Sequence, residues 1–302
     1  MVKVVRALKK LVFLAADVDA RLDRIQQALG RVELRQLRNA QSLREAEFQV
    51  SSQWGEDGIV QYLIARVRIE RRIFVEFGVQ NYREANTRFL LQHDNWAGLV
   101  IDGDAENINQ LRSDPIFWRH NLKAECAFID RENINHIFVR NGVSGDIGLL
   151  SIDIDGNDYW VWKAIDNIAP RIVITEYNGL FGPKARVTIP YIPDFQRTRA
   201  HYSNLYWGAS LGALEMLANE KGYSLVGSNG AGNNAFFVRK DVLNGLPACT
   251  CEEAYVEPQF RESRSETGAL TFLDRRAALK LLASMPVFDV ARNDEIKIGE
   301  IA

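Results

Sequence analysis

The sequence predicts an α/β protein with a Rossmann-like, doubly wound and mostly parallel sheet, a terminal antiparallel hairpin, and an N-terminal coiled-coil helix before the sheet. Three observations support this prediction. Short apolar segments alternate with helical segments from residue 51 to about residue 175, which is typical of parallel βαβ units. The apolar segments are nearly continuous, as in strands that are covered on both faces. Before them, apolar residues recur at heptad spacing between residues 11 and 32.

The composition limits the class of protein. Lys and Arg number 37 against 39 Asp and Glu, for a net charge of −2, which argues against a dedicated nucleic-acid binder because such proteins usually carry a basic excess. Three cysteines cannot all pair within one chain and suit a reducing compartment. No apolar run approaches the ~20 residues that a membrane span needs. We therefore expect a cytoplasmic protein without a nucleic-acid partner.

Residues 1–50 are expected to form a helical, coiled-coil oligomerisation segment. Their apolar residues follow the 4-3-4-3 spacing of an a/d seam over about three heptads, and the polar residues between them are expected to face solvent. An amphipathic helix packed on its own domain would show the same pattern, but we favour a homo-oligomer formed through residues 11–32. The basic start of the chain would allow at most peripheral membrane contact. The seam residues are Leu11, Ala15, Val18, Leu22, Ile25, Leu29 and Val32.

Residues 51–245 are expected to form the sheet domain. Each predicted strand is short, apolar and bounded by glycine or polar residues, and each predicted helix has apolar residues at helical spacing. We expect parallel strands at 72–77, 98–102, 124–129, 148–154 and 171–175, and helices at 58–65, 84–92, 106–111, 134–139, 159–165 and 210–221.

The remainder of the chain is expected to be less regular. A long polar and aromatic insertion at residues 177–207 follows the fifth strand. Two strands at 224–226 and 235–238, joined by a loop rich in glycine and asparagine, predict the terminal hairpin. Residues 246–302 are expected to form a C-terminal extension with one helix, at 269–283, and an irregular end.

An acidic residue lies at the end of each of the five predicted parallel strands. In an open parallel sheet, ligands bind at the carboxyl ends of the strands, near the point where the strand order reverses. Acids also favour the first turns of the following helices through the helix dipole, but an acid after every strand exceeds what capping requires. The residues are Glu76, Asp102, Asp130, Asp153 and Glu176.

The loop after the first strand argues against a dinucleotide or a nucleoside triphosphate. It contains one glycine, Gly78, so that the GxGxxG fingerprint is absent, and no GxxxxGK[ST] motif occurs in the chain. Asp102 lies 24 residues after Gly78, where an acid can accept both hydroxyls of a ribose. A ligand with a ribose and a positive charge but no phosphate fits these acids, and S-adenosylmethionine has that composition.

The order of these motifs resembles the FkbM-type branch of the class I S-adenosylmethionine-dependent methyltransferases. The resemblance covers about residues 51–240, and the motif after the fourth strand is its most specific element. It rests on Glu76-Phe-Gly78, Val100-Ile-Asp102, Ser151-Ile-Asp153-Ile-Asp155-Gly-Asn-Asp158 and Ile174-Thr-Glu176.

The resemblance implies a role for each acid at the strand ends. Glu76 and Gly78 would line the methionine end of the cofactor, and Asp102 would hold the ribose. Asp130 would meet the adenine amino group, and Asp153 would lie beside the methyl-transfer centre.

Asn81 would lie beside the methionine end as well. The first loop lacks the second and third glycines that are common in such enzymes, and Asn81 is expected to ease the turn because asparagine tolerates a positive φ.

Methyl transfer to oxygen requires a base for the hydroxyl proton. His201, in the aromatic loop after the fifth strand, is the leading candidate, and Glu176 is the alternative. Asn178, Tyr202 and Tyr206 are expected to bind the substrate.

A divalent cation is a further alternative at the strand ends. Asp153 or Asp155, with Glu176 and Asn178, would offer hard oxygen ligands. We favour hydrogen bonding to cofactor and substrate by the same groups, so no metal is expected.

The sequence therefore predicts an S-adenosylmethionine-dependent O-methyltransferase that acts on a hydroxyl of a sugar, a glycan or a related metabolite. The sugar preference follows from the resemblance alone. The alternative is a non-catalytic, oligomeric Rossmann-like module that binds a ligand or a partner. A nicotinamide oxidoreductase is disfavoured by the missing glycine fingerprint.

Overall fold

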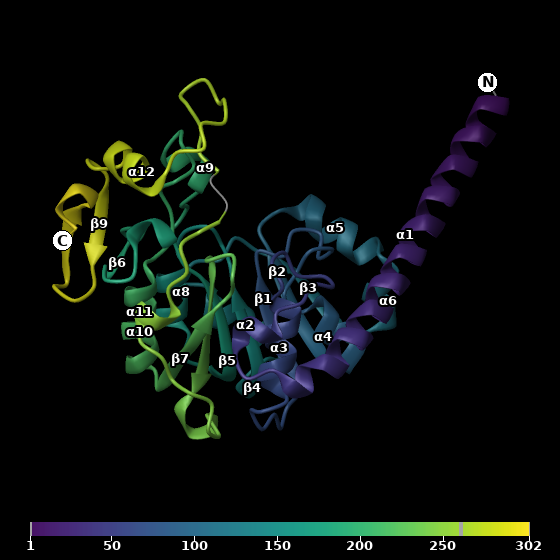
Figure 1. Cartoon of the computed structure of the whole chain (residues 1–302). Helices are drawn as coiled ribbons and strands as arrows, with labels where there is room; N and C mark the ends of the chain where they lie inside the picture. Colours follow the sequence, from purple (N-terminus) through teal and green to yellow (C-terminus); the bar gives the residue numbers. More distant parts are fainter. Residues whose placement is uncertain (1, 260–261, 302) are drawn as a thin grey trace.

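A seven-stranded sheet with the strand order β3-β2-β1-β4-β5-β8-β7 forms the centre of the protein (Figure 1). The computed structural model describes residues 2–259 and 262–301. The strands of this sheet are β1 Ile73–Phe77, β2 Ala97–Asp102, β3 Leu122–Cys126, β4 Gly145–Ile152, β5 Ile168–Glu176, β7 Tyr223–Ser228 and β8 Asn234–Arg239.

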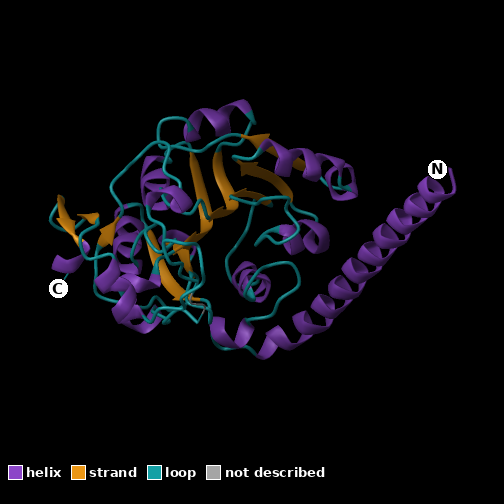
Figure 2. Ribbon diagram, turned by 90° about the horizontal axis from the view of Figure 1, so that it is seen from above, coloured by secondary structure: helices purple, strands orange, loops and turns teal. Residues whose placement is uncertain are grey.

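Helices cover both faces of the sheet (Figure 2). One apolar core lies between the sheet and α3, α4 and α5, and the other lies between the sheet and α7, α8 and α10. The helices are α1 Val2–Gln36, α2 Leu43–Ala46, α3 Glu56–Ile64, α4 Arg88–Asp94, α5 Ala105–Ser113, α6 Pro115–Arg119, α7 Ile134–Arg140, α8 Asp158–Ala164, α9 Arg197–Ala200, α10 Leu211–Glu220, α11 Cys251–Ala254 and α12 Arg275–Leu281.

The strand pairing confirms the predicted fold class. Strands β1 to β5 pair in parallel with one another, whereas β8 is antiparallel to both β5 and β7, which gives the expected terminal hairpin. The chain passes from β1 outward to β2 and β3, and then returns to place β4 on the other side of β1. The order of strands therefore reverses between β1 and β4, where the carboxyl ends of the strands leave room for a ligand.

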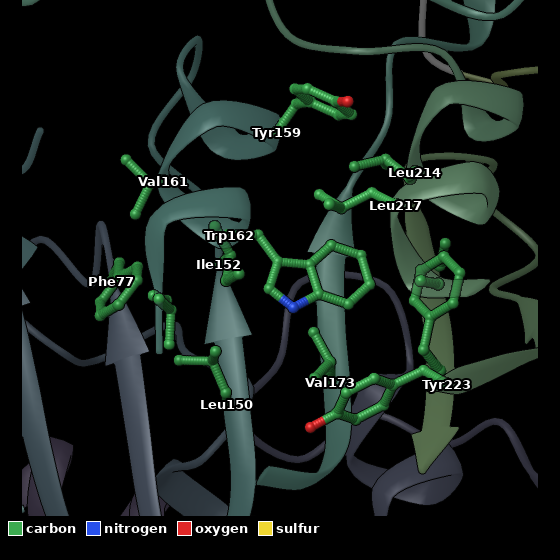
Figure 3. Packing of buried hydrophobic residues seen from close by; sticks show 14 of the residues in the cluster. Phe77, Leu150, Ile152, Tyr159, Val161, Trp162, Val173, Leu214, Leu217 and Tyr223 are labelled. Carbon is green, nitrogen blue, oxygen red and sulfur yellow. The ribbon is translucent and has the colours of Figure 1, made fainter. Parts of the chain in front are cut away.

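Trp162 of α8 is the centre of the second core. Figure 3 shows its indole between Val173 of β5, Leu214 and Leu217 of α10, and Tyr223 of β7. Trp162 is almost completely buried, and burial of a large apolar side chain stabilises the fold by roughly 1.5–3 kcal/mol. This packing fixes α8, and with it the loop between β4 and α8, against the sheet.

The helix after β1 begins later than predicted. It starts at Arg88 rather than at residue 84, because the backbone before it is held by a contact from the sheet. The carboxylate of Glu76 accepts hydrogen bonds from the backbone N–H groups of Asn86 at 2.7 Å and Thr87 at 3.1 Å. A tertiary contact of this kind has no signal in local sequence.

The C-terminal segment contains more structure than predicted. In addition to α12, it forms β9 Pro286–Asp289 and β10 Asp294–Lys297, which pair with each other and with β6 Val187–Thr188 as a small antiparallel sheet. A third apolar cluster, which includes Ile189 and Val287, lies beneath this sheet. Each of the two C-terminal strands has only four residues, and β10 is charged except for Ile296, so neither showed the alternation that would have predicted it.

Helix α1 extends away from the sheet domain (Figures 1 and 2). Contrary to the expectation from sequence, two of the polar residues between the heptad positions, Asp23 and Gln27, face the domain rather than solvent, whereas Arg21, Arg24 and Gln26 are exposed. Asp23 lies 3.6 Å from Arg88 of α4, and Gln27 bonds to Gln92 at the end of the same helix. Gly30 is buried, and a β-carbon there would lie 2.6 Å from Val50 and 2.9 Å from Phe89.

The apolar heptad positions of α1 lie on the opposite, unoccupied side of the helix. The five that the structure describes are between 47 and 59% exposed, although they are large apolar side chains. The exposed positions are Val18, Leu22, Ile25, Leu29 and Val32.

Among the helices in the described ranges, none combines the length and the apolar character that a bilayer crossing requires.

Candidate functional site

A cavity of about 550 Å³ lies at the carboxyl ends of the parallel strands. It occupies the place where the strand order reverses, and the loops after β1, β2, β3, β4 and β5 all contribute to it. Its lining residues are Gln53, Gly78, Gln80, Ile101, Asp102, Gly103, Asn107, Ala127, Phe128, Ile129, Asp153, Ile154, Asp155, Asn157, Glu176, Phe195, Arg197 and Glu262.

Asp102 is fixed at one end of this cavity. Its Oδ2 accepts a hydrogen bond from the backbone N–H of Gln80 at 2.7 Å, and its Oδ1 accepts from Asp104 N–H at 2.8 Å and from Asn107 at 3.3 Å. A carboxylate has about four acceptor sites, so this one retains capacity for a ligand. Phe128, which is 47% exposed, presents an aromatic surface at the same end.

A cluster of carboxylates lies at the other end of the cavity. Asp153, Asp155 and Glu176 each bring an oxygen to within 4.8 Å of the others. Burial, followed by the charges of neighbouring acids, raises the pKa values of Asp153 and Glu176 well above their ordinary values. Glu176 is 7% exposed and its Oε2 has no hydrogen-bond partner among the described residues. We call Asp153, Asp155 and Glu176 the acid cluster.

Asp158 shapes the loop that carries two of these acids. Its carboxylate accepts hydrogen bonds from the backbone N–H groups of Ile154 and Gly156, both at 2.9 Å. Burial raises the pKa of Asp158 to about 6, and the two backbone donors oppose the rise. The loop is thereby held in a tight turn in which Asp155 adopts a left-handed conformation, with φ of +55°.

Arg197 joins this cavity to a second one. Its Nη1 lies 2.8 Å from Asp155 Oδ1, its Nε donates to the carbonyl of Asn204 at 2.7 Å, and its guanidinium lies 4.8 Å from the ring centre of Trp207. The second cavity has a volume of about 370 Å³ and lies between the end of β5 and the C-terminal segment. Arg197 and Glu262 line both cavities.

The second cavity combines apolar surface with polar groups. The apolar surface comes from Tyr177, Leu205 and Trp207. The polar groups include Asn178, Glu257, Gln259 and Arg275. Its described lining is completed by Gly179, Leu180, Gly232, Pro258, Leu273 and Asp274.

Four of the residues predicted for cofactor binding line the first cavity or adjoin it, and two do not. Gly78, Asp102 and Asp153 line it, and Glu76 lies on the adjoining β1 with its carboxylate turned toward Asn86 and Thr87. Asn81 is directed to a separate surface hollow. Asp130 caps the start of α7, where it accepts hydrogen bonds from the N–H groups of Glu132 and Asn133.

The turn after β1 differs from the expectation. The left-handed positions are Gly78, Gln80 and Tyr82, with φ of +68°, +48° and +63°. Asn81 is not among them, so it does not ease the turn in the predicted way. Burial of Tyr82, whose hydroxyl bonds to Thr87, holds this loop in place.

The predicted acceptor residues are dispersed. His201 lies outside the described lining of both cavities, with Nδ1 2.8 Å from Ser203 Oγ, and burial lowers its pKa. Tyr202 stacks on the His201 ring at the surface, and Tyr206 is buried with its hydroxyl on the carbonyl of Pro286. Asn178 lines the second cavity, but its amide already bonds to the carbonyls of Leu205 and Trp207.

Sequence reasoning missed three residues of the site. Phe128 lies two residues before the predicted Asp130, and Asn157 lies within the fourth-strand motif, so their positions carried a usable signal. Arg197 lies in the irregular insertion, where no pattern relates it to the strand ends. Asn157 is 3% exposed, its Nδ2 donates to Ile192, and its Oδ1 is without a partner in the described structure.

The comparisons with known proteins identify no family. No protein-family model matches the sequence, and no curated protein matches it. Among solved structures, the chain is similar to the N-terminal domain of EvdMO1 in the presence of SAH and D-fucose, with 10% identity and a TM-score of 0.39 over 69% of this chain and 94% of that one.

Two further solved structures show a similarity of the same size. The first is an S-adenosylmethionine-dependent methyltransferase from Clostridium acetobutylicum ATCC 824, with 10% identity and a TM-score of 0.40 over 62% of this chain and 90% of that one. The second is the CurJ carbon methyltransferase, also with 10% identity and a TM-score of 0.40, over 60% and 52% of the two chains. Identities of this size do not establish an activity.

Proposed function

We propose that the protein is an S-adenosylmethionine-dependent O-methyltransferase of the FkbM type, which methylates a hydroxyl of a sugar, a glycan or a related metabolite. One observation carries the proposal: a single cavity at the reversal of strand order has a carboxylate suited to a ribose at one end and a cluster of carboxylates at the other. The only glycine of the first loop is Gly78, so this loop does not suit a pyrophosphate.

The residues present fit the cofactor. Asp102 retains capacity to accept a further hydrogen bond, from a ribose hydroxyl, and Phe128 offers an aromatic surface on which an adenine stacks. Glu176 Oε2 is buried without a partner, which suits a positively charged ligand, since a buried carboxylate is stabilised by an opposite charge. When bound, S-adenosylmethionine supplies a methyl group on a positively charged sulfur.

The second cavity suits the acceptor. It shares Arg197 and Glu262 with the first cavity, so a molecule bound there reaches the acid cluster. Trp207 and Leu205 provide an apolar wall for the face of a sugar ring, and Glu257 and Gln259 offer hydrogen bonds to its hydroxyls. These residues position the hydroxyl and exclude water around it.

The proton of the acceptor hydroxyl is taken by a carboxylate of the acid cluster. Glu176, the alternative base from the sequence, lines the first cavity within the acid cluster, and burial raises its pKa, which makes its carboxylate a stronger base. His201 is less suited because it lies outside the described lining of both cavities.

We further propose that the protein forms a homo-oligomer through the exposed seam of α1, and that the divisions at residues 50 and 245 separate the oligomerisation segment, the catalytic domain and the C-terminal extension. The apolar seam faces away from the sheet domain, which supports pairing with a second copy. We propose a cytoplasmic location because Cys126, Cys249 and Cys251 are all free.

The test is calorimetric titration of the purified chain with S-adenosylmethionine and, separately, with NAD. We expect saturable binding of S-adenosylmethionine alone. Asp102→Asn should weaken it by about tenfold or more, since the variant loses a charged hydrogen-bond acceptor.

Asp114→Asn is the matched control. Asp114 caps α6 by accepting from Ile116, and asparagine caps equally well, so this variant should bind as the wild type does. Absence of binding to the wild type would refute the proposal and favour the non-catalytic module. Unchanged affinity in Asp102→Asn would refute the role of Asp102.

A further inference from the structure

The acid cluster brings three carboxyl groups together with little positive charge from the described protein to balance them. Three carboxylates from the ends of two neighbouring strands converge within 4.8 Å, and a fourth, Asp158, is buried beneath their loop. In the described part of the chain the basic side chain that contacts them is Arg197, which pairs with Asp155, the most exposed of the three. One positively charged side chain thus faces three carboxyl groups.

Two buried oxygens, from residues that line the same cavity, have no hydrogen-bond partner among the described residues. Glu176 Oε2 belongs to the cluster, and Asn157 Oδ1 belongs to a neighbouring side chain that is 3% exposed and lines the same cavity. The Asn157 amide is oriented by its Nδ2, which donates to the carbonyl of Ile192 at 2.8 Å. A buried acceptor without a partner is costly, so both oxygens call for a donor or a cation.

We propose that the acid cluster binds one hard divalent cation, such as Mg²⁺ or Mn²⁺, with Asp153, Asp155 and Glu176 as ligands and Asn157 Oδ1 beside them. Carboxylate and amide oxygens are the ligands that these cations prefer. The charge of a dication offsets the excess that remains after Arg197 is counted. The proposal replaces the expectation from sequence that no metal is held.

The evidence for the cation site does not depend on the proposed function, but its consequence for methyl transfer rests on that function. A cation bound at the cluster lowers the pKa of a hydroxyl that binds to it, so the acceptor hydroxyl loses its proton more readily. Each of the three residues offers one oxygen to the cation. The second carboxylate oxygen of Asp153 or Glu176 would remain to accept that proton. The methyl group would then pass from the sulfur of S-adenosylmethionine to the acceptor oxygen, so that the S–CH3 bond breaks as the O–CH3 bond forms and S-adenosylhomocysteine leaves.

The experiment is a calorimetric titration of the full chain with Mn²⁺ after removal of metals with EDTA, with the paramagnetic signal of free Mn²⁺ as a second readout. We expect one saturable site per chain, with displacement of Mn²⁺ by Mg²⁺. Asp155→Asn and Glu176→Gln should each lower the affinity by at least about tenfold, the loss that even an outer-shell partner produces.

Asp194→Asn is the matched control. Asp194 is exposed near the cavity, and the substitution removes the same charge without touching the cluster, so its affinity should equal that of the wild type. Asp155 has a side chain that is 58% exposed, so its variant is expected to fold even if Glu176→Gln does not. Absence of saturable binding, or equal affinity in Asp155→Asn and the wild type, would overturn the cation site.

Parallel titrations separate this inference from the proposed function. S-adenosylmethionine is titrated in the presence of EDTA, and Mn²⁺ is titrated without S-adenosylmethionine. Binding of Mn²⁺ alone would retain the cation site and refute the methyltransferase. Binding of S-adenosylmethionine alone would do the reverse.

Discussion

A β-carbon on Gly78 would lie 1.8 Å from the carbonyl oxygen of Asp153. The loop after β1 and the loop after β4 therefore touch backbone to backbone, at the place where the strand order reverses. Because Asp153 belongs to the acid cluster, a displacement of the first loop also displaces the acids. The same loop also holds Asp102 through the backbone N–H of Gln80, so it links the two ends of the cavity.

Gly78→Ala is expected to destabilise the fold and to abolish cofactor binding. The substitution combines a left-handed φ of +68° with a clash against backbone, and we expect a loss of roughly 3 kcal/mol in the free energy of unfolding. Gly222→Ala is the control, because φ there is +83° and nothing lies within 4 Å of the added β-carbon. Chemical denaturation of both variants checks this. Similar losses in the two would show that the contact with Asp153 costs nothing.

Glu76 is expected to make stability depend on pH. Burial raises its pKa from 4.5 to about 7, against opposing hydrogen bonds from Thr87 and Asn86. The folded protein therefore holds this proton more tightly than the unfolded chain. Its contribution to the free energy of unfolding is complete below about pH 4.5 and is lost as the pH rises through about 7. The total loss is about 3 kcal/mol.

The check is denaturation of Glu76→Gln and wild type between about pH 5 and pH 8. The variant should show a smaller fall in the free energy of unfolding across this window. Asp57, whose pKa burial also raises, lies near Glu76 and titrates in both proteins, so the difference between the two slopes reports on Glu76. Equal slopes would show that Glu76 stays ionised throughout.

Arg197→Gln is expected to raise the affinity of the acid cluster for Mn²⁺ by about tenfold, since a positive charge 2.8 Å from Asp155 opposes the binding of another cation. Calorimetry against the wild type measures this. Weaker binding in the variant would mean that Arg197 serves to position Asp155 rather than to compete for it.

Leu22→Asp is expected to lower the oligomeric state, because it places a charge in the centre of the exposed seam of α1. Ala20→Asp is the control, since Ala20 is also exposed but lies off the seam. The molar mass from light scattering is the measurement. If Leu22→Asp retains the mass of the wild type, the seam does not hold the chains together.

The sheet was predictable because its strands are buried on both faces. Strand β1 was expected at residues 72–77 and is found at Ile73–Phe77, since a continuous apolar run of this kind is stable only between two layers. The strands β9 and β10 were not predictable in the same way. Each has only four residues, β10 is mostly charged, and β9 pairs with β6, which lies about 100 residues earlier in the chain.

The site was predictable as a place but only partly as a set of side chains. The rule that ligands bind at the ends of parallel strands brought Asp102, Asp153 and Glu176 to one cavity. The rule does not say where a side chain points, so Glu76 and Asp130 were included although their carboxylates bond to nearby backbone N–H groups. Arg197 could not be found, because its position depends on the folding of an irregular insertion.

Helix α1 meets the domain at a contact with no room for a methyl group, at Gly30, while its seam faces the other way. The close contact of Gly30 with Val50 and with Phe89 of α4 therefore fixes the orientation of α1 relative to the domain. A second chain bound along the seam has its own domain clamped at the same angle. If two chains pair along the seam, the relative orientation of their domains, and hence the direction in which their cavities open, depends on the packing at position 30 as well as on the seam itself.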